Sequence, residues 1–113
     1  MTEKTVKIVN LTPHEVTVVA SNGDVMMKVP ASGQVARCSV NRTTVGKLNG
    51  IPVAKSVMGD VEGLPEPSED TIYIVSRVVA EAMKGKRDDL VIPDDAVRDG
   101  EGRIIGCKGF AVV

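Results

Sequence analysis

The sequence predicts an α+β fold in which antiparallel β-structure dominates. The first half alternates short β-branched or apolar runs with turn signals, as is typical of strands joined by hairpins. The second half holds one amphipathic helical pattern directly after a strand, and a Gly-containing turn near the C-terminus predicts a closing hairpin. With 113 residues, of which 42% are apolar and 26% charged, one folded domain over 1–113 is expected. We expect an N-terminal meander or small barrel, one short helix and a C-terminal β-hairpin.

About six strand signals precede residue 60. Each is a short β-branched or alternating run, and turn chemistry separates it from the next. The pairs Asn22-Gly23 and Asn49-Gly50 are typical of two-residue hairpin turns. The expected strands are Lys4–Val9, Glu15–Ala20, Val25–Val29, Val35–Val40, Thr43–Leu48 and Ile51–Val57. Their succession predicts an antiparallel meander in which sequence neighbours pair.

Residues 59–70 are rich in Gly, Pro and acidic residues and are expected to form a loop. This loop connects a strand-rich part, 1–58, with a strand–helix–hairpin part, 71–113. Within the second part, Thr71–Val75 has the continuous apolar run of a buried strand. Ser76 follows it and is suited to cap the N-terminus of a helix.

The predicted helix has one apolar face and is expected to end at Gly85. The face consists of Val75, Val78, Val79, Ala82 and Met83, which recur at helical spacing. Pro93 ends a short apolar run after the helix, and because proline lacks an N–H we expect it at a sheet edge or a bend. The turn at 99–102 is expected to join Ala96–Arg98 with Arg103–Cys107 in a final hairpin.

The composition argues against several classes of protein. The chain has 14 Lys and Arg against 15 Asp and Glu, a formal net charge of -1, which argues against a dedicated binder of duplex nucleic acid. Tyr73 and Phe110 are the only aromatic residues, so a platform for stacking successive bases is not expected. No apolar run approaches the ~20 residues that span a bilayer, and the charged start is unlike a signal peptide. A cytoplasmic protein without membrane contact is therefore expected.

Cysteine and histidine are scarce. Cys38 and Cys107 lie in apolar contexts without CxxC spacing, so we expect two buried thiols and neither metal binding nor redox chemistry. His14 is the only histidine and lies in the turn Asn10–His14, where a structural capping role is favoured over general base catalysis. The acidic residues of 88–101 lack the spacing of a calcium loop. No metal and no cofactor are expected.

Arginine is the residue type that points to a binding site. Arg77 is expected in the first helical turn, where unpaired backbone N–H groups favour a phosphate. Arg87 follows the helix, Arg98 and Arg103 flank the last hairpin, and guanidinium groups bind phosphates bidentately. Surface ion pairs with neighbouring acids are the competing interpretation for each arginine. The predicted ligand-binding residues are Tyr73, as a stacking ring, with Ser76, Arg77, Arg87, Arg98 and Arg103.

Charge is distributed unevenly along the chain. Residues 1–58 hold seven bases and three acids, residues 59–83 hold one base and six acids, and residues 84–113 hold six of each. If these parts face outward on different sides, the strand-rich part presents a mildly basic surface and the loop an acidic one. A mixed, solvated surface is the simpler alternative.

Six motifs of the chain resemble those of small proteins encoded by phages, prophages and related bacterial genomes. They are I-V-N-L-T-P-H-E-V (Ile8–Val16), P-A-S-G-x-V-A-R (Pro30–Arg37), G-x-x-x-G-L-P-E-P (Gly59–Pro67), T-I-Y-I-V-S (Thr71–Ser76), R-D-D-L-x-x-P-D (Arg87–Asp94) and V-R-D-x-x-G-R-I-I-G-C (Val97–Cys107). Within that set the chain resembles the first-described Thoeris anti-defence family. These phage sponge proteins sequester cyclic ADP-ribose signals that bacterial TIR enzymes make. The likeness covers nearly the whole chain.

The resemblance implies a β-rich homo-oligomer in the cytoplasm of the bacterial host cell, with ligand pockets at subunit interfaces. The implied ligand is a cyclic ADP-ribose isomer, with cyclic oligonucleotides as a second class. Sequestration needs no chemical step, which agrees with the missing GxSxG, HExxH, Walker and GxGxxG motifs. Carried over by motif, the contacts would be Tyr73, Ser76 and Arg77 at the strand–helix junction, with Arg87 and Arg98.

Two other interpretations remain open. A phage or prophage inhibitor that acts by protein–protein contact would need no small-molecule pocket and would use the loop at 59–70. A small nucleotide-processing enzyme would use His14 as a base and the acids of 88–99 as metal ligands. Incubation with cyclic ADP-ribose separates the three, because the ligand is recovered intact, recovered converted or never bound.

Overall fold

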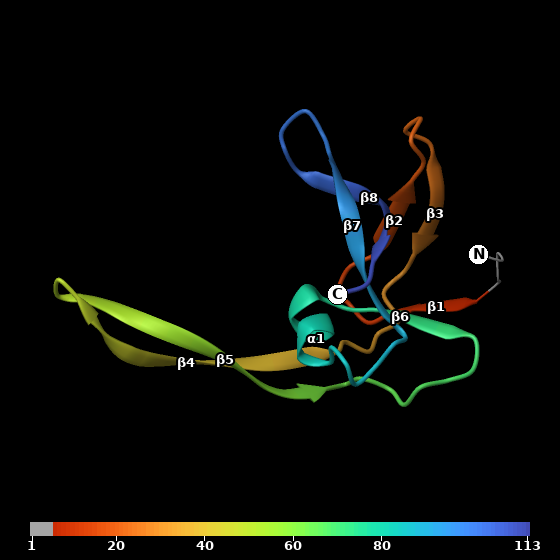
Figure 1. Cartoon of the computed structure of the whole chain (residues 1–113). Helices are drawn as coiled ribbons and strands as arrows, with labels where there is room; N and C mark the ends of the chain where they lie inside the picture. The colour runs from red at the N-terminus through yellow and green to blue at the C-terminus, as the bar shows by residue number, and fades with distance from the viewer. Residues whose placement is uncertain (1–5) are drawn as a thin grey trace.

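The computed structural model describes residues 6–113. Within that range, eight strands and one short helix form a six-stranded sheet and a separate two-stranded hairpin (Figure 1). The strands are β1 (Lys7–Asn10), β2 (Val16–Val19), β3 (Val25–Val29), β4 (Arg37–Leu48), β5 (Ile51–Glu62), β6 (Thr71–Ile74), β7 (Leu90–Arg98) and β8 (Ile104–Ala111), and the helix is α1 (Arg77–Ala82). The expected β-rich fold with one short helix is confirmed. No helical segment of these residues has the length and apolarity that crossing a bilayer requires.

The six-stranded sheet combines both halves of the chain in the order β1-β6-β7-β8-β2-β3. The pairs β1–β6, β6–β7 and β8–β2 are parallel, whereas β2–β3 and β7–β8 are antiparallel hairpins. The predicted N-terminal meander is wrong, because Lys7 of β1 lies opposite Thr71 of β6. The Leu11 N–H donates to the carbonyl of Ile74 (2.9 Å), so the chain stays beside β6 after β1 ends and makes no hairpin with β2.

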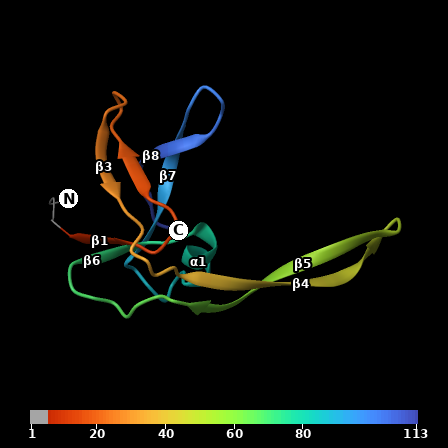
Figure 2. The same cartoon turned by 180° about the vertical axis from the view of Figure 1, so that it is seen from behind.

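The longest hairpin is an arm, formed by β4 and β5, that projects from the body made by the six-stranded sheet and α1 (Figure 2). The radius of gyration is 17.0 Å, whereas a compact chain of this length is expected near about 13 Å. The two strands predicted between 35 and 48 are one strand of 12 residues, because Asn41 and Arg42 lie in the ladder opposite Val57 and Ser56. The predicted loop at 59–70 is likewise shorter and begins at Gly63, since β5 continues to Glu62.

The core lies where α1 covers the sheet. It consists of Leu11, Ala36, Tyr73, Val75, Val79, Ala80, Leu90 and Ile92. Ser76 is the predicted N-cap and accepts a hydrogen bond from the Val79 N–H (3.4 Å). The apolar face is rotated from the expected one, since Val78 is 38% exposed and Ala80 is buried. The helix also ends earlier than expected, at Ala82, and Gly85 lies in the turn that follows.

Pro93 lies within β7, an inner strand of the sheet, where a sheet edge or a bend was expected. The physical constraint is still respected. β6 pairs with β7 only at Leu90 and Val91, so β7 has no neighbour on that side when it reaches Pro93. There Pro93 lies opposite Phe110 of β8. The side of β7 on which proline lacks an N–H is the side that has no neighbouring strand at this point.

Asn10 fixes the turn between β1 and β2. Its side chain is 1% exposed, and its amide donates to the carbonyls of His14 (2.8 Å) and Val29 (3.0 Å). Its carbonyl oxygen accepts from the N–H (2.9 Å) and the hydroxyl (2.6 Å) of Thr12. All four hydrogen-bonding positions of the amide are used, as a buried polar group requires. The structural interpretation of the turn 10–14 is confirmed.

Gly63 allows the arm to rejoin the body. Its φ is +78°, and an added Cβ would collide with the backbone carbonyl of Val35. The Gln34 side chain donates to the Gly63 carbonyl (2.7 Å), so the two segments are held at this close approach. A glycine is needed here both for the backbone angle and for the space.

Substituting Gly63 with alanine is therefore expected to cost more than the same change at Gly50, which has a φ of +79° but no atom within 4 Å of the point where a Cβ would lie. Gly50→Ala should lower the free energy of unfolding by about 1–2 kcal/mol, the cost of a left-handed alanine. Gly63→Ala should lose about 1–3 kcal/mol more because of the collision. Urea unfolding followed by circular dichroism measures both, and equal losses would contradict the close approach.

Candidate functional site

An open groove of about 570 Å³ lies at the root of the arm. Its walls come from β4 at Arg37–Val40, from β5 at Asp60 and Glu62, and from the start of α1 at Ser76 and Val78. Its volume lies in the range of small-molecule sites, roughly 300–1,000 Å³. Since three elements far apart in sequence meet here, the groove is the candidate functional site.

A β-bulge shapes the wall of the groove that the arm provides. The register of β4 and β5 shifts between Cys38 and Val40, so Ser39 lies opposite both Gly59 and Asp60. A Cβ on Gly59 would collide with the hydroxyl of Ser39, so a larger residue here would require the Ser39 side chain to rotate away. Bulges re-aim side chains at the ends of paired strands. Here the residue after Gly59, Asp60, lines the groove.

The charged side chains of the groove are available to a ligand. Arg37, Asp60 and Glu62 are exposed, and within residues 6–113 their side chains form no hydrogen bond or ion pair. A guanidinium binds phosphate oxygens, and carboxylates accept hydrogen bonds from ribose hydroxyls. Val40 and Val78, which are 46% and 38% exposed, add apolar surface.

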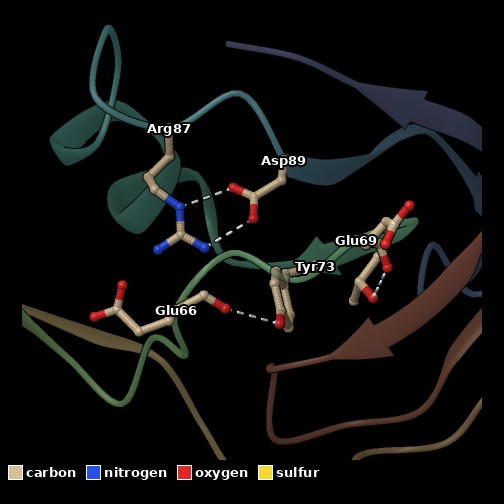
Figure 3. Close-up of polar contacts among 6 residues, drawn as sticks. Glu66, Glu69, Tyr73, Arg87 and Asp89 are labelled. Atoms are coloured by element: carbon tan, nitrogen blue, oxygen red, sulfur yellow. Dashed lines mark hydrogen bonds and ion pairs between the residues drawn. The ribbon is translucent and has the colours of Figure 1, made fainter.

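The predicted stacking ring, Tyr73, is part of the core. It is 5% exposed, and its hydroxyl donates to the backbone carbonyl of Glu66 (3.3 Å; Figure 3). The Arg87 guanidinium lies 6.0 Å from the ring centroid, within reach of a cation–π contact. The ring therefore contacts protein, and a base can stack on it only if the core opens.

Arg87 is occupied by a partly buried ion pair. Its Nε and Nη2 donate to the two carboxylate oxygens of Asp89 at 2.9 and 2.8 Å (Figure 3), and the side chains are 12% and 11% exposed. The hydrogen bonds from Arg87 lower the pKa of Asp89 below its usual value and, in turn, raise the pKa of Arg87. Arg87 also lines a second open hollow of about 500 Å³ with Lys86 and Asp88, so its free edge remains near solvent.

The start of α1 offers less to an anion than expected. Arg77 is 70% exposed and pairs with Glu81 one turn later (Nε to Oε1, 3.1 Å). The helix has only six residues, and the Ser76 hydroxyl already accepts one of the first-turn N–H groups. Ser76 nevertheless lines the groove and is the one predicted site residue that does.

Arg98 and Arg103 lie at the turn between β7 and β8. Arg98 donates to the carbonyl of Gly102 (2.7 Å), and Arg103 pairs loosely with Glu101 (3.3 Å, both well exposed). The nine residues of β7 separate this turn from α1, about 30 Å at strand spacing. Figure 1 shows the turn pointing away from the root of the arm. A single chain therefore does not bring the four predicted arginines together.

His14 and the two cysteines are not assembled into a catalytic cluster. His14 is exposed, and its backbone carbonyl accepts the hydrogen bonds that fix the turn. Within residues 6–113 no group of three His, Cys, Asp or Glu residues is placed to hold a metal ion. Cys107 is buried, and burial raises the pKa of its thiol. The expectation of two buried thiols is wrong for Cys38, which is half-buried because it lies where the arm leaves the core.

Comparisons with protein-family models, with curated proteins and with solved structures find no match to this chain. The site is therefore argued from its geometry. The sequence analysis did not identify Arg37, Asp60 and Glu62 as site residues. Each lies in a predicted strand or loop, and that local pattern does not show which distant residues it will meet. The usable signal was that Arg37 ends one of the six motifs, whereas Asp60 and Glu62 occupy unspecified positions of another motif and had no such signal.

The Arg87–Asp89 pair makes a pH-dependent prediction. Asp89→Asn should lower the free energy of unfolding at pH 7 by about 1.5–3 kcal/mol, as for hydrogen bonds to charged groups. Because the folded pKa of Asp89 is lowered, its contribution is present above the unfolded pKa of 3.8 and is lost as pH falls through the folded value. The difference between the wild type and Asp89→Asn should therefore shrink below about pH 4.

Urea unfolding at pH 7, 5, 4 and 3 measures this difference. Glu81→Gln is the matched control, since it removes the exposed pair with Arg77 and should change stability by less than about 0.5 kcal/mol. A constant difference across the pH series would contradict a stabilising role for the Asp89 carboxylate.

Proposed function

We propose that this protein is a non-catalytic sponge that binds and sequesters a cyclic nucleotide signal, with part of the ligand held in the groove at the root of the arm. One observation carries the proposal. Three of the six motifs that resemble the anti-defence family contribute a motif residue to this one groove: Pro13, Arg37 and Ser76 come from three different motifs. These motifs are separated in sequence, and the fold brings them together.

The chemistry of the groove fits one part of a cyclic ADP-ribose isomer. Arg37 is suited to a phosphate, and Asp60 and Glu62 are suited to ribose hydroxyls or an adenine amino group. The valines offer a surface for the base in place of an aromatic ring. The open shape is suited to holding a ligand between surfaces, so no step of bond cleavage is assigned to these residues.

The charge of the groove supports a site that a second copy would complete. Arg37, Asp60 and Glu62 are the charged residues that line it, so the groove has one negative charge in excess. A pyrophosphate needs further cations, and neither Arg98 nor Arg103 lines this groove in the same chain. Both flank the β7–β8 turn, which points away from the root of the arm (Figure 1). The proposal therefore places the ligand at an interface of a homo-oligomer, with arginines from another copy near the phosphates.

By resemblance, the ligand is a cyclic ADP-ribose isomer made by a TIR enzyme, and cyclic oligonucleotides are a second class. Sequestration in the cytoplasm of the bacterial host cell would lower the free signal and inhibit antiviral defence. Incubation with the signal, removal of unbound material and heat denaturation test this directly. Intact ligand after release supports a sponge, converted ligand supports an enzyme, and absence of ligand supports an inhibitor that acts by protein contact.

Arg37 should be required for binding. Arg37→Ala is expected to weaken the affinity for cyclic ADP-ribose about 10- to 150-fold, the loss of a charge-assisted hydrogen bond of about 1.5–3 kcal/mol. Lys28→Ala removes one exposed positive charge from β3, outside the groove, and should leave the affinity nearly unchanged. Isothermal titration calorimetry measures both variants.

Arg98→Ala tests the contribution of another copy. Arg98 does not line the groove of its own chain and is bonded to Gly102 at the β7–β8 turn, so weaker binding would indicate that a second copy supplies it. Unchanged affinity in both Arg37→Ala and Arg98→Ala would overturn this assignment of the site.

A further inference from the structure

The outer arm, residues 40–58, exposes apolar side chains that its own chain does not cover. Val45, Leu48 and Ile51 are 62%, 69% and 66% exposed, and Val57 is 49% exposed. Leu48 and Ile51 are directly opposed in the ladder at the tip. An isolated two-stranded hairpin is marginally stable in water, and both of its edges carry unpaired backbone groups. A contact with another molecule would cover the apolar side chains and provide partners for the unpaired backbone groups.

The charge of the molecule is divided along its long axis. The outer arm carries Arg42, Lys47 and Lys55 and no acidic residue. The loop at 63–70 carries three acidic residues and no base. Both views show the arm projecting on one side of the body and this loop curving round the opposite side (Figures 1 and 2). Each chain therefore presents a basic, apolar arm and, on the opposite side, an acidic loop, whose end lies beside the exposed Lys7 of β1.

We propose that the outer arm binds the loop at 63–70 of a second copy, in an antiparallel two-fold dimer. Two chains with opposite charge at their two ends attract when they lie side by side in opposite directions. A two-fold axis makes both arm–loop contacts equivalent and closes the assembly. The arm of each copy then lies on the body of the other.

The dimensions fit this arrangement. A strand of 12 residues spans about 40 Å, and the longest extent of the molecule is 52 Å. An arm beside a second copy can therefore reach the opposite end of that copy. The outer arm and the loop together contain 27 residues, which matches the roughly 20–30 residues that each partner contributes to a standard interface.

Charge also favours the loop of a second copy over two other possible partners of the outer arm. Two outer arms laid against each other would bring like charges together. A nucleic acid would meet only three basic residues on the arm, in a chain whose net charge is -1. The loop offers Glu66 and Glu69, which are exposed and form no ion pair within residues 6–113. The charge of Glu66 also acts on the nearby Arg87, whose pKa it helps to raise. The proposal deepens the proposed function by defining how two copies meet, and it is tested without ligand.

A charge swap tests the dimer. The arm variant Lys47→Glu/Lys55→Glu repels the loop of a second copy, and the loop variant Glu66→Lys/Glu69→Lys repels the arm. All four side chains are exposed, so each variant should keep the wild-type circular dichroism spectrum. In light scattering after gel filtration, the wild type should be a dimer in low salt, and each variant alone should be largely monomeric.

Mixing the two variants should restore the dimer, because the reversed arm then faces the reversed loop at both contacts. Leu48→Ser/Ile51→Ser should also weaken the dimer without unfolding the body, since these side chains lie at the exposed tip. A monomeric wild type, a dimer that both charge variants retain, or a mixture that stays monomeric would each overturn the proposal. Salt-dependent nucleic-acid binding by a monomer through the same lysines would also overturn it. If the charge-swap experiment fails but the protein still binds the ligand, this interface is rejected and the proposed sponge function is not.

Discussion

The position of the groove depends on the buried side chain of Asn10. Its four hydrogen bonds hold the turn after β1 against the end of β3. The next residue, Leu11, donates to Ile74 at the end of β6 and accepts from the N–H of Ala36 at the start of the arm. One short segment therefore fixes the end of β6, the N-terminal side of α1 and the root of β4. The start of α1 and the root of β4 are two of the three walls of the groove, so the turn that Asn10 holds helps to set its geometry.

The body of the molecule has a hydrophobic core, whereas the outer arm has none. Cys38, Val61 and Leu64 at the root of the arm pack against the core, so the arm leaves the body in a defined direction. Beyond the bulge at Ser39, the same two strands have no layer beneath them. A hairpin of this length without a core is consistent with a role in contacts with other molecules.

Features with a local cause were predictable from the sequence. The turn at Asn49-Gly50, the Ser76 cap and the turn at 99–102 each depend on a few adjacent residues, although the strands of the last hairpin are longer than predicted and β8 continues to Ala111. The parallel pairing of β1 with β6 was not, because it joins segments whose local patterns contain no information about each other. The arginines are a second example. The sequence indicates which elements carry them, but it does not show that Arg87 forms an ion pair with Asp89, two residues along the chain. The groove residues Arg37 and Glu62 belong together only once the arm has formed.

Under the proposed function, the charge balance of the groove would link ligand binding to assembly. Asp60 and Glu62 would repel a pyrophosphate at short range if Arg37 were its only cation, because like charges a few ångströms apart cost free energy that a single ion pair does not offset in a solvated site. Cations from another copy would make the net interaction of the site with a pyrophosphate attractive. Ligand would then bind the assembled form more tightly than the single chain, and by mass action it would favour assembly. If the protein is the proposed sponge, it would hold its ligand most tightly when it is abundant enough to assemble.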